Sequence, residues 1–326
     1  MGLGGLFGRL FGGKGGPRGE AARPDVARPE QRPPEQGLSV DELARRLGMS
    51  AEEIAAVQPS YQEFRIPKRS GGTRTIAAPD AALKALQRRI LPRLLARLAA
   101  HPAATGFERS QSIATNAAVH VGQAVVVHVD LENFFDSTPA RTVAAYFRAA
   151  GWNRDAAEVL TRLCTWKGRL PQGAPTSPRL SNLVNRRLDL RLAGAAAKFG
   201  AVYTRYADDL VFSFASDERQ AIHGVIRITK KVLDEHRYRL NQKKKLDIRR
   251  RSDRQMVTGL VVNDRVNLPR RTRRMLRAAA HRRATGGECT LTPAQLAGWA
   301  SLEAMIAAQT RPAMDGSNAG GQGENP

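Results

Sequence analysis

The strongest constraint on the fold is a pair of adjacent carboxylates, Asp208 and Asp209, set between two strand-like runs. The flanking residues that favour β-structure are Tyr203, Tyr206, Val211, Phe212 and Phe214. They predict a β-hairpin whose tight turn carries both aspartates. Because adjacent like charges repel unless a cation neutralises them, a divalent metal is the functional interpretation. A solvated polar turn is the simpler alternative, and it is the usual outcome for an isolated Asp-Asp pair.

A third carboxylate ends another strand-like segment. Asp130 follows a largely apolar, β-branched run at residues 125–129 that is long enough for a buried strand. A helix should begin near Pro139, and Ser137 and Thr138 are better placed than Asp130 to cap it. If this strand lies beside the hairpin, three carboxylates converge, which is tenable only around cations. Two Mg²⁺ ions about 4 Å apart form such a site, where they activate a hydroxyl and stabilise a leaving pyrophosphate.

The charge balance predicts a polyanionic partner. Lysines and arginines number 52 against 30 aspartates and glutamates, which gives a net charge of +22. Residues 249–283 contain 12 arginines and two aspartates, with short strand-like runs and then a helix from about Pro269. Such an excess favours phosphate contacts, with nucleic acid as the first candidate and an anionic membrane surface as the second.

Other broad classes are disfavoured. No apolar run approaches the roughly 20 residues that span a bilayer, so we expect a soluble, cytoplasmic protein without a membrane partner. Cys164 and Cys289 are far apart in the sequence and have no His or Cys at metal-ligand spacing. Neither a disulfide framework nor a zinc site is therefore expected.

The two ends of the chain, residues 1–36 and 311–326, have low-complexity compositions and are predicted to be disordered tails. Order should begin with two short helices in residues 37–62. Their capping boxes pair Ser39 with Glu42 and Ser50 with Glu53. A DNA-binding helix-turn-helix is one interpretation. Because the second helix is acidic, we favour a small helical cap packed on the next domain.

A basic hairpin is predicted at residues 64–79. Its tip carries paired glycines and the cations Lys68, Arg69 and Arg74. Three cations in such a place suit a triphosphate or a nucleic-acid backbone, and a solvated hairpin is the alternative.

A loop rich in proline and glycine at residues 170–179 leads into a predicted helix over residues 180–192. Ser177, followed by a proline, is the expected N-cap. Backbone amides at this helix start, together with Gln172, suit an incoming nucleotide. A merely rigid connection is the alternative.

Three further helices are predicted at residues 83–98, 113–120 and 293–308. The first should kink at Pro92, and the last should be capped by Thr292. His120, in the second, is a lone histidine of the kind that is more often structural than catalytic.

Three segments taken together resemble the central palm motifs of reverse transcriptases, in the same order. They are residues 129–137, 170–178 and 206–209. Two more elements, Asn-Ala-x-x-His at residues 116–120 and Val-Thr-Gly at 257–259, resemble bacterial retron reverse transcriptases in particular. The resemblance covers about residues 60–285.

The resemblance implies an α+β, right-hand polymerase fold with fingers, palm and thumb, in which the palm is an antiparallel sheet packed on helices. The implied regions are an N-terminal helical cap (37–62), fingers (63–122), palm (123–248) with a finger insertion around 140–180, and thumb (249–310). Such a fold would use an RNA template to direct DNA synthesis.

The resemblance also implies roles at the metal and sugar sites. Asp130 and Asp208 would hold two Mg²⁺ ions, for which Mn²⁺ can substitute, and Leu131 and Asp209 would complete the metal ligands. Phe135 would clash with a ribose 2′-hydroxyl and so select deoxynucleotides.

Further roles concern the nucleotide and the nucleic acid. Gln172 would line the nucleotide pocket, and Lys68 and Arg74 would clamp the triphosphate. The residues expected to contact nucleic acid are Asn116, His120, Lys244, Val257, Thr258, Gly259, Arg270, Arg271 and Arg274. A lysine among residues 243–245 would protonate the leaving pyrophosphate, and which of the three does so stays open.

The implied function is that of a retron enzyme. It would copy part of a cognate structured non-coding RNA into single-stranded DNA, starting from a 2′-hydroxyl and using dNTPs. The association of the family with anti-phage defence makes an effector or toxin protein a candidate partner.

Four other classes compete with this prediction. A group II intron enzyme would carry a maturase region after the thumb, but only about 40 residues follow Arg283. Stand-alone defence and diversity-generating reverse transcriptases share the palm and remain open. A non-catalytic RNA-binding descendant would usually lack an aspartate or a nucleotide-pocket residue, and none is missing. An RNA-dependent RNA polymerase would want a small or polar residue in place of Phe135.

Overall fold

The computed structural model describes residues 37–67, 71–241 and 246–310, so both predicted tails lie outside the described residues. The strands are β1 (Tyr61–Pro67), β2 (Thr73–Pro79), β3 (Val125–Asp130), β4 (Ala201–Tyr206), β5 (Asp209–Phe214), β6 (Asp247–Arg250), β7 (Met256–Val257) and β8 (Leu260–Val261). The helices are α1 (Val40–Leu47), α2 (Ala51–Ala56), α3 (Ala81–Ile90), the π-helix η1 (Leu91–Leu95), α4 (Ile113–Ala118), α5 (Ala140–Ala149), α6 (Arg154–Cys164), α7 (Ser177–Val184), α8 (Arg186–Lys198), α9 (Arg219–Glu235), α10 (Arg270–Ala284) and α11 (Pro293–Gln309). Within these ranges, no helix has the length and apolar content needed to cross a membrane.

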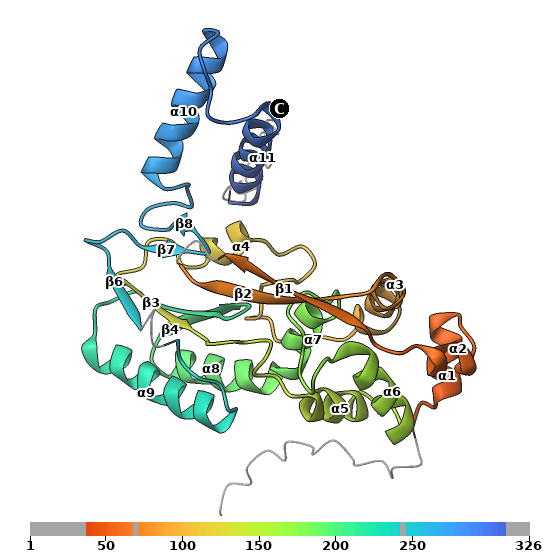
Figure 1. Cartoon of the computed structure of the whole chain (residues 1–326). Helices are drawn as coiled ribbons and strands as arrows, with labels where there is room; N and C mark the ends of the chain where they lie inside the picture. The colour runs from red at the N-terminus through yellow and green to blue at the C-terminus, as the bar shows by residue number, and fades with distance from the viewer. Residues whose placement is uncertain (1–36, 68–70, 242–245, 311–326) are drawn as a thin grey trace, which may run out of the picture.

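A four-stranded antiparallel sheet in the order β4-β5-β3-β6 lies at the centre of the molecule. Helices α8 and α9 cover one of its faces, as Figure 1 shows. Alternate residues of β3 point to opposite faces, so Val125, Val127 and Val129 pack toward these helices. The residues between them, Val126 and His128, face the other side, where α4, β7 and β8 pack. Both faces of β3 are therefore covered, which explains its nearly continuous apolar sequence.

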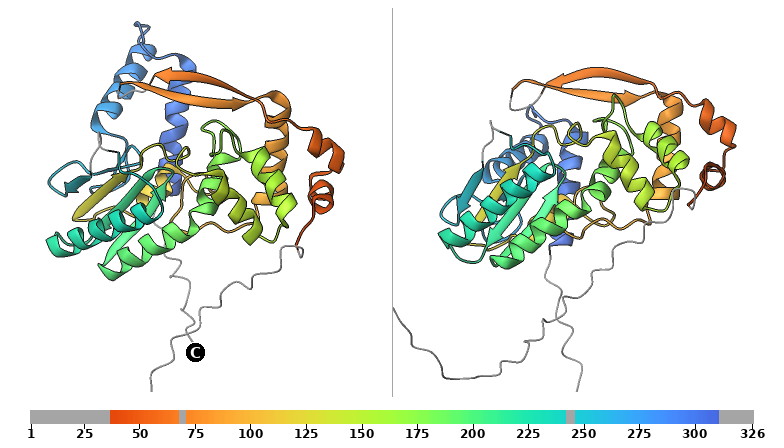
Figure 2. Two further views of the ribbon diagram at one scale, coloured as in Figure 1. Left: turned by 60° about the horizontal axis from the view of Figure 1, so that its bottom comes forward. Right: turned by 90° about the horizontal axis from the view of Figure 1, so that it is seen from below.

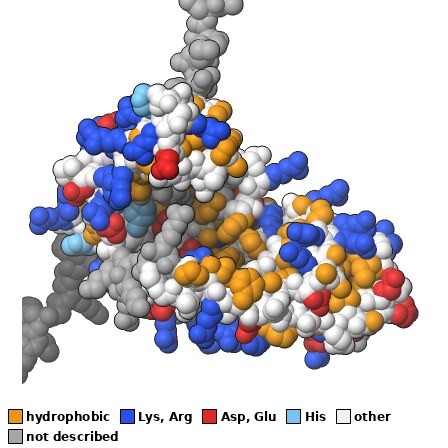
Figure 3. Space-filling model, turned by 45° about the horizontal axis from the view of Figure 1, so that its top comes forward, with side chains coloured by type: hydrophobic (Ala, Val, Ile, Leu, Met, Phe, Trp, Pro, Cys, Tyr) orange, Lys and Arg blue, Asp and Glu red, His pale blue; other side chains and the backbone are white. Residues whose placement is uncertain are grey.

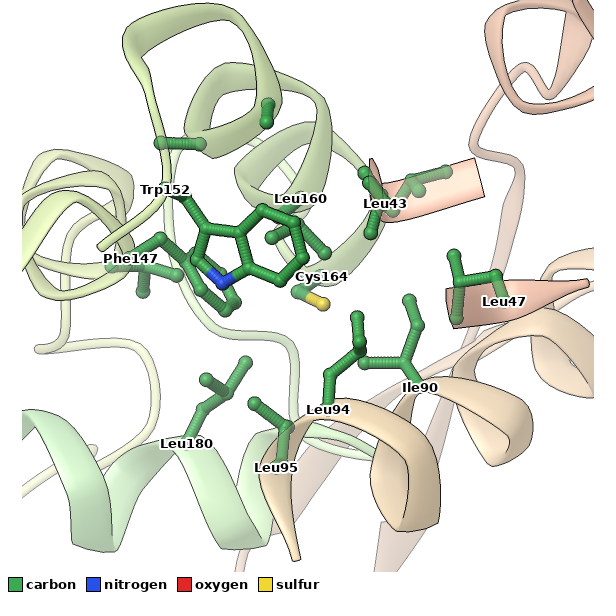
Figure 4. Packing of buried hydrophobic residues seen from close by; sticks show 14 of the residues in the cluster. Leu43, Leu47, Ile90, Leu94, Leu95, Phe147, Trp152, Leu160, Cys164 and Leu180 are labelled. Carbon is green, nitrogen blue, oxygen red and sulfur yellow. The ribbon is translucent and has the colours of Figure 1, made fainter. Parts of the chain in front are cut away.

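The two N-terminal helices belong to a second core. Leu43 and Leu47 of α1 and Ile54 of α2 are fully buried, and they pack with apolar side chains of α3, η1, α5, α6 and α7. Figure 4 shows Leu43 and Leu47 beside Ile90, Leu160 and Cys164. Each such side chain contributes about 1.5–3 kcal/mol of burial free energy. The packing supports the interpretation of this segment as a cap on the following domain.

Strands β1 and β2 form a long hairpin that projects across the molecule, as both views of Figure 2 show. Most of β1 is exposed, and Ala77 and Pro79 near the end of β2 are buried. Gly71 and Gly72 have φ angles of 86° and 78°, which glycine adopts without steric strain. The predicted hairpin is therefore present, although Lys68 and Arg69 at its tip lie outside the described residues.

Two helix predictions were wrong in detail. The single helix expected over residues 180–192 is two helices, α7 and α8, separated at Asn185. The Asn185 side chain donates to the Ser181 carbonyl and to the Tyr238 hydroxyl. In a continuous helix the Ser181 carbonyl would accept from the backbone amide of residue 185, so here the side chain replaces that amide. Ser177 is the first residue of α7 rather than its N-cap, which is Thr176.

Capping at α5 also differs from expectation. Its N-cap is Pro139 with no side-chain cap bond, so neither Ser137 nor Thr138 has that role. The Thr138 hydroxyl pairs instead with the Tyr238 hydroxyl at 2.9 Å. A kink or break was predicted at Pro92, and the chain passes there from α3 into the π-helix η1, so the regular α-helix ends at this point.

The C-terminal region packs on the sheet face opposite α8 and α9. Strands β7 and β8 are joined by Thr258 and Gly259, whose φ angles of 48° and 84° are typical of a two-residue type I′ turn. Helix α11 begins directly after the predicted cap Thr292, and Ile306 near its end is buried in a cluster with apolar side chains of α4, β7, β8 and α10. Helix α10 extends away from the sheet in Figure 1.

Candidate active site

The register of the central sheet brings the predicted carboxylates to one edge of one face. Asp130 at the end of β3 lies directly opposite Asp209 at the start of β5. Asp208 and Ala207 form the turn between β4 and β5, with Ala207 at a φ of 57°. The Leu131 amide donates to the Asp208 carbonyl at 2.9 Å, which ties the turn to the end of β3. The predicted hairpin and the adjoining strand are both present, but the turn carries only Asp208, because Asp209 is already paired with Tyr206 as the first residue of β5.

Two neighbouring side chains hold these carboxylates. Asn241 donates to Asp130 through its side-chain amide at 2.7 Å, and its backbone amide donates to the Asp130 carbonyl at 2.9 Å. His128 Nδ1 lies 3.2 Å from Asp209 Oδ1. Burial alone would lower the pKa of His128, but the hydrogen bond and the charge of Asp209 outweigh it and raise that pKa. The contact with Asp209 thus favours the charged form of His128, which would offset part of the carboxylate charge.

The carboxylates open onto a cleft of about 820 Å³. Its lining residues are Arg74, Ile113, His128, Asp130, Tyr206, Asp208, Asp209, Leu246, Asp247, Arg249 and Thr258. Figure 3 shows several groups of Lys and Arg side chains on the face that it presents, separated by apolar and neutral surface. Arg74 reaches the cleft from the hairpin and Thr258 from the β7–β8 turn, so the cleft joins three regions predicted separately from the sequence.

The donor set fits Mg²⁺. Among the residues that the structure describes, no three His, Cys, Asp or Glu side chains already form a metal cage. Mg²⁺ does not require one, because it keeps several waters and binds through one or two carboxylates plus substrate phosphates. Asp130 and Asp208 supply hard oxygen ligands of that kind at a partly exposed edge. The metal site therefore remains compatible with the predicted residues.

Among the predicted nucleotide residues that the structure describes, Arg74 lines the cleft, whereas Gln172 and Phe135 are not among its lining residues. The carbonyl of Gln172 accepts a hydrogen bond from the Ala77 amide at 2.8 Å, which joins its loop to the hairpin. A Cβ atom on Gly173, whose φ is 130°, would lie 2.7 Å from the Ala77 oxygen. Glycine is therefore required for this close approach. Phe135 is partly buried and packs against Phe134, with ring centroids 5.5 Å apart.

Three of the residues expected to contact nucleic acid are buried. Asn116, His120 and Val257 are 0% exposed, so direct contact through their side chains is not supported. The side-chain oxygen Oδ1 of Asn116 accepts a hydrogen bond from the Thr105 hydroxyl at 2.7 Å. His120 bridges two strands, with Nδ1 2.7 Å from the Ser213 hydroxyl and Nε2 2.8 Å from the Thr204 hydroxyl. The Asn-Ala-x-x-His element therefore fastens α4 to the central sheet.

The other residues expected to contact nucleic acid are exposed or partly buried, or they lie outside the described residues. Arg270, Arg271 and Arg274 are exposed on α10, while Leu276 and Ala279 of the same helix face the core. The lysines at 243–245, including Lys244, lie outside the described residues, as does Lys68. The Thr258 hydroxyl donates to the Ile113 carbonyl at 2.8 Å, and Gly259 shares its turn.

We predict that His120 makes stability depend on pH. Burial lowers the pKa of His120 from 6.5 to about 3, so the folded state resists protonation while the unfolded chain binds a proton below pH 6.5. The stability is present above pH 6.5 and is lost as the pH falls toward 3. Urea unfolding at pH 7 and pH 5 should show a loss of about 2 kcal/mol that His120→Gln removes. Substitution of the exposed His223 by Gln is the control. Equal pH dependence of wild type and His120→Gln would contradict this assignment.

A buried ion pair contacts the turn that carries Asp208. Arg205 and Asp189 are both 0% exposed, and their side chains form two hydrogen bonds of 2.7 and 2.6 Å. Arg205 Nη1 also donates to the Ala207 carbonyl at 3.2 Å and to the Asn182 side-chain oxygen at 3.1 Å. The Tyr203 hydroxyl donates to Asp189 at 2.9 Å. The pair therefore holds a backbone atom of the turn that carries Asp208.

Several residues of this site were not predicted from the sequence. His128 stands two positions before Asp130, so the two-residue period of a strand puts both on one face. That signal was available in the sequence. Asn241 and Arg205 carry no comparable signal, because their partners are distant in the sequence and become neighbours only in the folded chain.

The comparison with known families decides the class. A family model described as "Reverse transcriptase (RNA-dependent DNA polymerase)" matches residues 66–254, more than half of the chain. The chain belongs to the reverse transcriptase family. The chain has the α+β right-hand fold that was predicted, with an antiparallel central sheet packed on helices. The boundaries of its cap, fingers, palm and thumb stay a prediction.

Relatives of this chain include retron enzymes. Retron Mx65 reverse transcriptase of Myxococcus xanthus is 39% identical over 264 residues, which cover 76% of this chain and 61% of the relative. Retron Ec86 reverse transcriptase of Escherichia coli is 40% identical over 212 residues, 64% of each chain. The chain thus spans about three fifths of the length of these relatives. Among solved structures, apo telomerase from Candida tropicalis, truncated from its C-terminal domain, aligns with a TM-score of 0.47 at 13% identity and covers 64% of this chain and 55% of its own.

Proposed function

We propose that the chain is an RNA-directed DNA polymerase whose active centre is the edge formed by Asp130, Asp208 and Asp209. The observation that carries the proposal is the register of the sheet, which sets Asp130 opposite Asp209 beside the turn of Asp208. Membership of the reverse transcriptase family supplies the reaction class. Arg74, which lines the same cleft from the hairpin, adds a cation where a triphosphate would lie.

The metal ligands in this proposal are the carboxylates of Asp130 and Asp208, with Asp209 and Leu131 beside them. Two Mg²⁺ ions, or Mn²⁺ in their place, would activate the primer hydroxyl and stabilise the leaving pyrophosphate. Asn241 fixes one Asp130 oxygen at 2.7 Å, so the carboxylate keeps its orientation toward the cleft edge. His128 does the same for Asp209. These contacts preorganise the acidic edge before substrate arrives.

Nucleic acid would lie along the cleft and against α10. The exposed Arg270, Arg271 and Arg274 suit the phosphates of a template-primer duplex, which carry no sequence information. An A-form-like duplex is recognised by its shape and backbone. Arg249 also lines the cleft, where its guanidinium pairs with Asp247 at 2.8 Å.

The finer proposal is that the enzyme serves a retron. It would copy part of a cognate structured RNA into single-stranded DNA, with a 2′-hydroxyl of that RNA as the primer. The same proposal includes an effector protein as partner and a role in anti-phage defence. The retron enzymes among its relatives support it. Sequencing of the nucleic acid that copurifies with the full chain tests it. One structured RNA joined to complementary DNA is expected, and RNA of mixed sequence without DNA would contradict it.

We predict that Phe135→Ala admits ribonucleotides. The ring would otherwise collide with a 2′-hydroxyl at the sugar position, so its removal should lower the preference for dNTPs over NTPs by about a hundredfold. Single-nucleotide extension of a DNA primer on an RNA template measures the preference as a ratio of kcat/KM values. Unchanged sugar selectivity in an active variant would show that Phe135 is not the gate.

A further inference from the structure

Phe107 is an exposed aromatic residue beside Phe135, the proposed sugar gate. Phe107 lies in the loop between η1 and α4, and 45% of its surface is exposed. Its ring centroid is 6.4 Å from that of Phe135 and 6.0 Å from that of Tyr206. Both separations are within the range of attractive aromatic pairs. Phe107 thus connects the gate of the sugar pocket to the strand end that leads into Asp208.

The loop that carries Phe107 is fastened to the catalytic hairpin. The Thr105 amide donates to the Arg205 carbonyl at 2.9 Å. The Asn182 side-chain amide donates to the Gly106 carbonyl at 2.6 Å. A Cβ atom on Gly106 would lie 2.9 Å from the Ala207 backbone nitrogen, so only glycine allows the loop to lie this close. The position of Phe107 is therefore coupled to the same turn that carries Asp208.

The backbone of Phe107 is held in an unfavourable conformation. Its φ is 64°, in the left-handed region that bulky residues rarely adopt. Such a conformation persists when the surroundings determine it, and residues of this kind concentrate at functional sites. The residue after it is held as well, because the Glu108 carboxylate accepts from the side chains of Asn182 and Arg179. Because the ring is exposed and the backbone is strained, we infer that the fixed backbone of the loop sets the position of the Phe107 ring.

We propose that Phe107 is a positioning residue for sugar selection. Its ring packs against Phe135 and limits the directions in which that ring can move, while Phe134 packs against Phe135 as a second support at 5.5 Å. If the Phe135 ring can move away from the sugar position, a 2′-hydroxyl fits there. A Phe135 ring packed between two other rings should therefore select dNTPs over NTPs more strongly than one packed against a single ring. The inference rests on the proposed polymerase function and adds the residue that keeps its gate in place.

The test is the ratio of kcat/KM for dNTP and for NTP in single-nucleotide extension of a DNA primer on an RNA template. Phe107→Ala should lower this ratio about tenfold, less than Phe135→Ala. Phe107→Ala could fail to fold because alanine is strained at the left-handed φ of this position. Phe107→Asn also removes the ring, and asparagine tolerates this backbone conformation, so it serves as the second variant. Leu190→Ala, at another exposed apolar residue, is the control and should leave the ratio unchanged.

A double variant separates positioning from a general effect. If Phe107 acts through Phe135, the variant that carries both Phe107→Ala and Phe135→Ala should have the ratio of Phe135→Ala alone. The inference is overturned if both Phe107 variants keep the wild-type ratio, or if the two losses multiply in the double variant. A wild-type chain that makes no DNA on any primed RNA template would instead overturn the proposed function, and this inference with it.

Discussion

Replacement of Asp208 and Asp209 together by asparagine is expected to abolish metal-dependent DNA synthesis, with a loss of about 10³-fold or more. The two side chains keep their shape but lose the charge that holds the cations. Asparagine can still make the hydrogen bonds of the turn, so the fold should persist. Primer extension on an RNA template measures the activity, and retention of RNA on a filter measures binding.

RNA binding should stay within about twofold of the wild type in this variant, since the phosphate contacts come from arginines elsewhere. Asp155→Asn, on the exposed side of α6, is a matched control that changes one carboxylate away from the cleft. DNA synthesis at the wild-type rate by the Asp208→Asn, Asp209→Asn variant would remove both residues from the catalytic centre.

The second large effect is expected at the buried ion pair. Asp189→Ala should lower the free energy of unfolding by about 3–5 kcal/mol, because it leaves the guanidinium of Arg205 buried without its charged partner. The variant also removes the acceptor of the Tyr203 hydroxyl. Urea unfolding followed by circular dichroism measures the change.

An exposed ion pair of this chain provides the control for that measurement. Glu235→Ala breaks the contact with Arg191, in which both side chains are about two-fifths exposed, and should change the free energy of unfolding by less than about 1 kcal/mol. A loss for Asp189→Ala no larger than this control would show that the Arg205 pair does not support the fold.

The central sheet was predictable because local pattern and tertiary structure agree there. The β-branched run that ends at Asp130 and the aromatic runs around Asp208 favour strands in isolation, and the structure pairs these strands side by side. The predicted helix over residues 180–192 failed at Asn185, whose partner Tyr238 is distant in the sequence. Periodicity continues through this break, so the pattern alone does not reveal it.

The candidate site was predictable where chemistry is concentrated in short motifs. Asp130, Asp208 and Arg74 line one cleft, as their residue types and positions indicated. Asn116 and His120 were assigned to nucleic acid because they belong to a recognisable element, yet both are interior residues that pair with side-chain hydroxyls. A motif reports that residues matter, and burial is needed to tell a structural role from a binding role.

The most direct test of the account is template-directed synthesis by the purified wild-type chain. The chain is supplied with a primed RNA of known sequence, all four dNTPs or all four NTPs, and Mg²⁺ or Mn²⁺, and the products are sequenced. We expect DNA complementary to the template, formed only when a divalent metal is present, and little product from NTPs. An RNA product, or no product with either metal on any primed RNA, would contradict the assignment of the edge at Asp130, Asp208 and Asp209 as a reverse transcriptase active site.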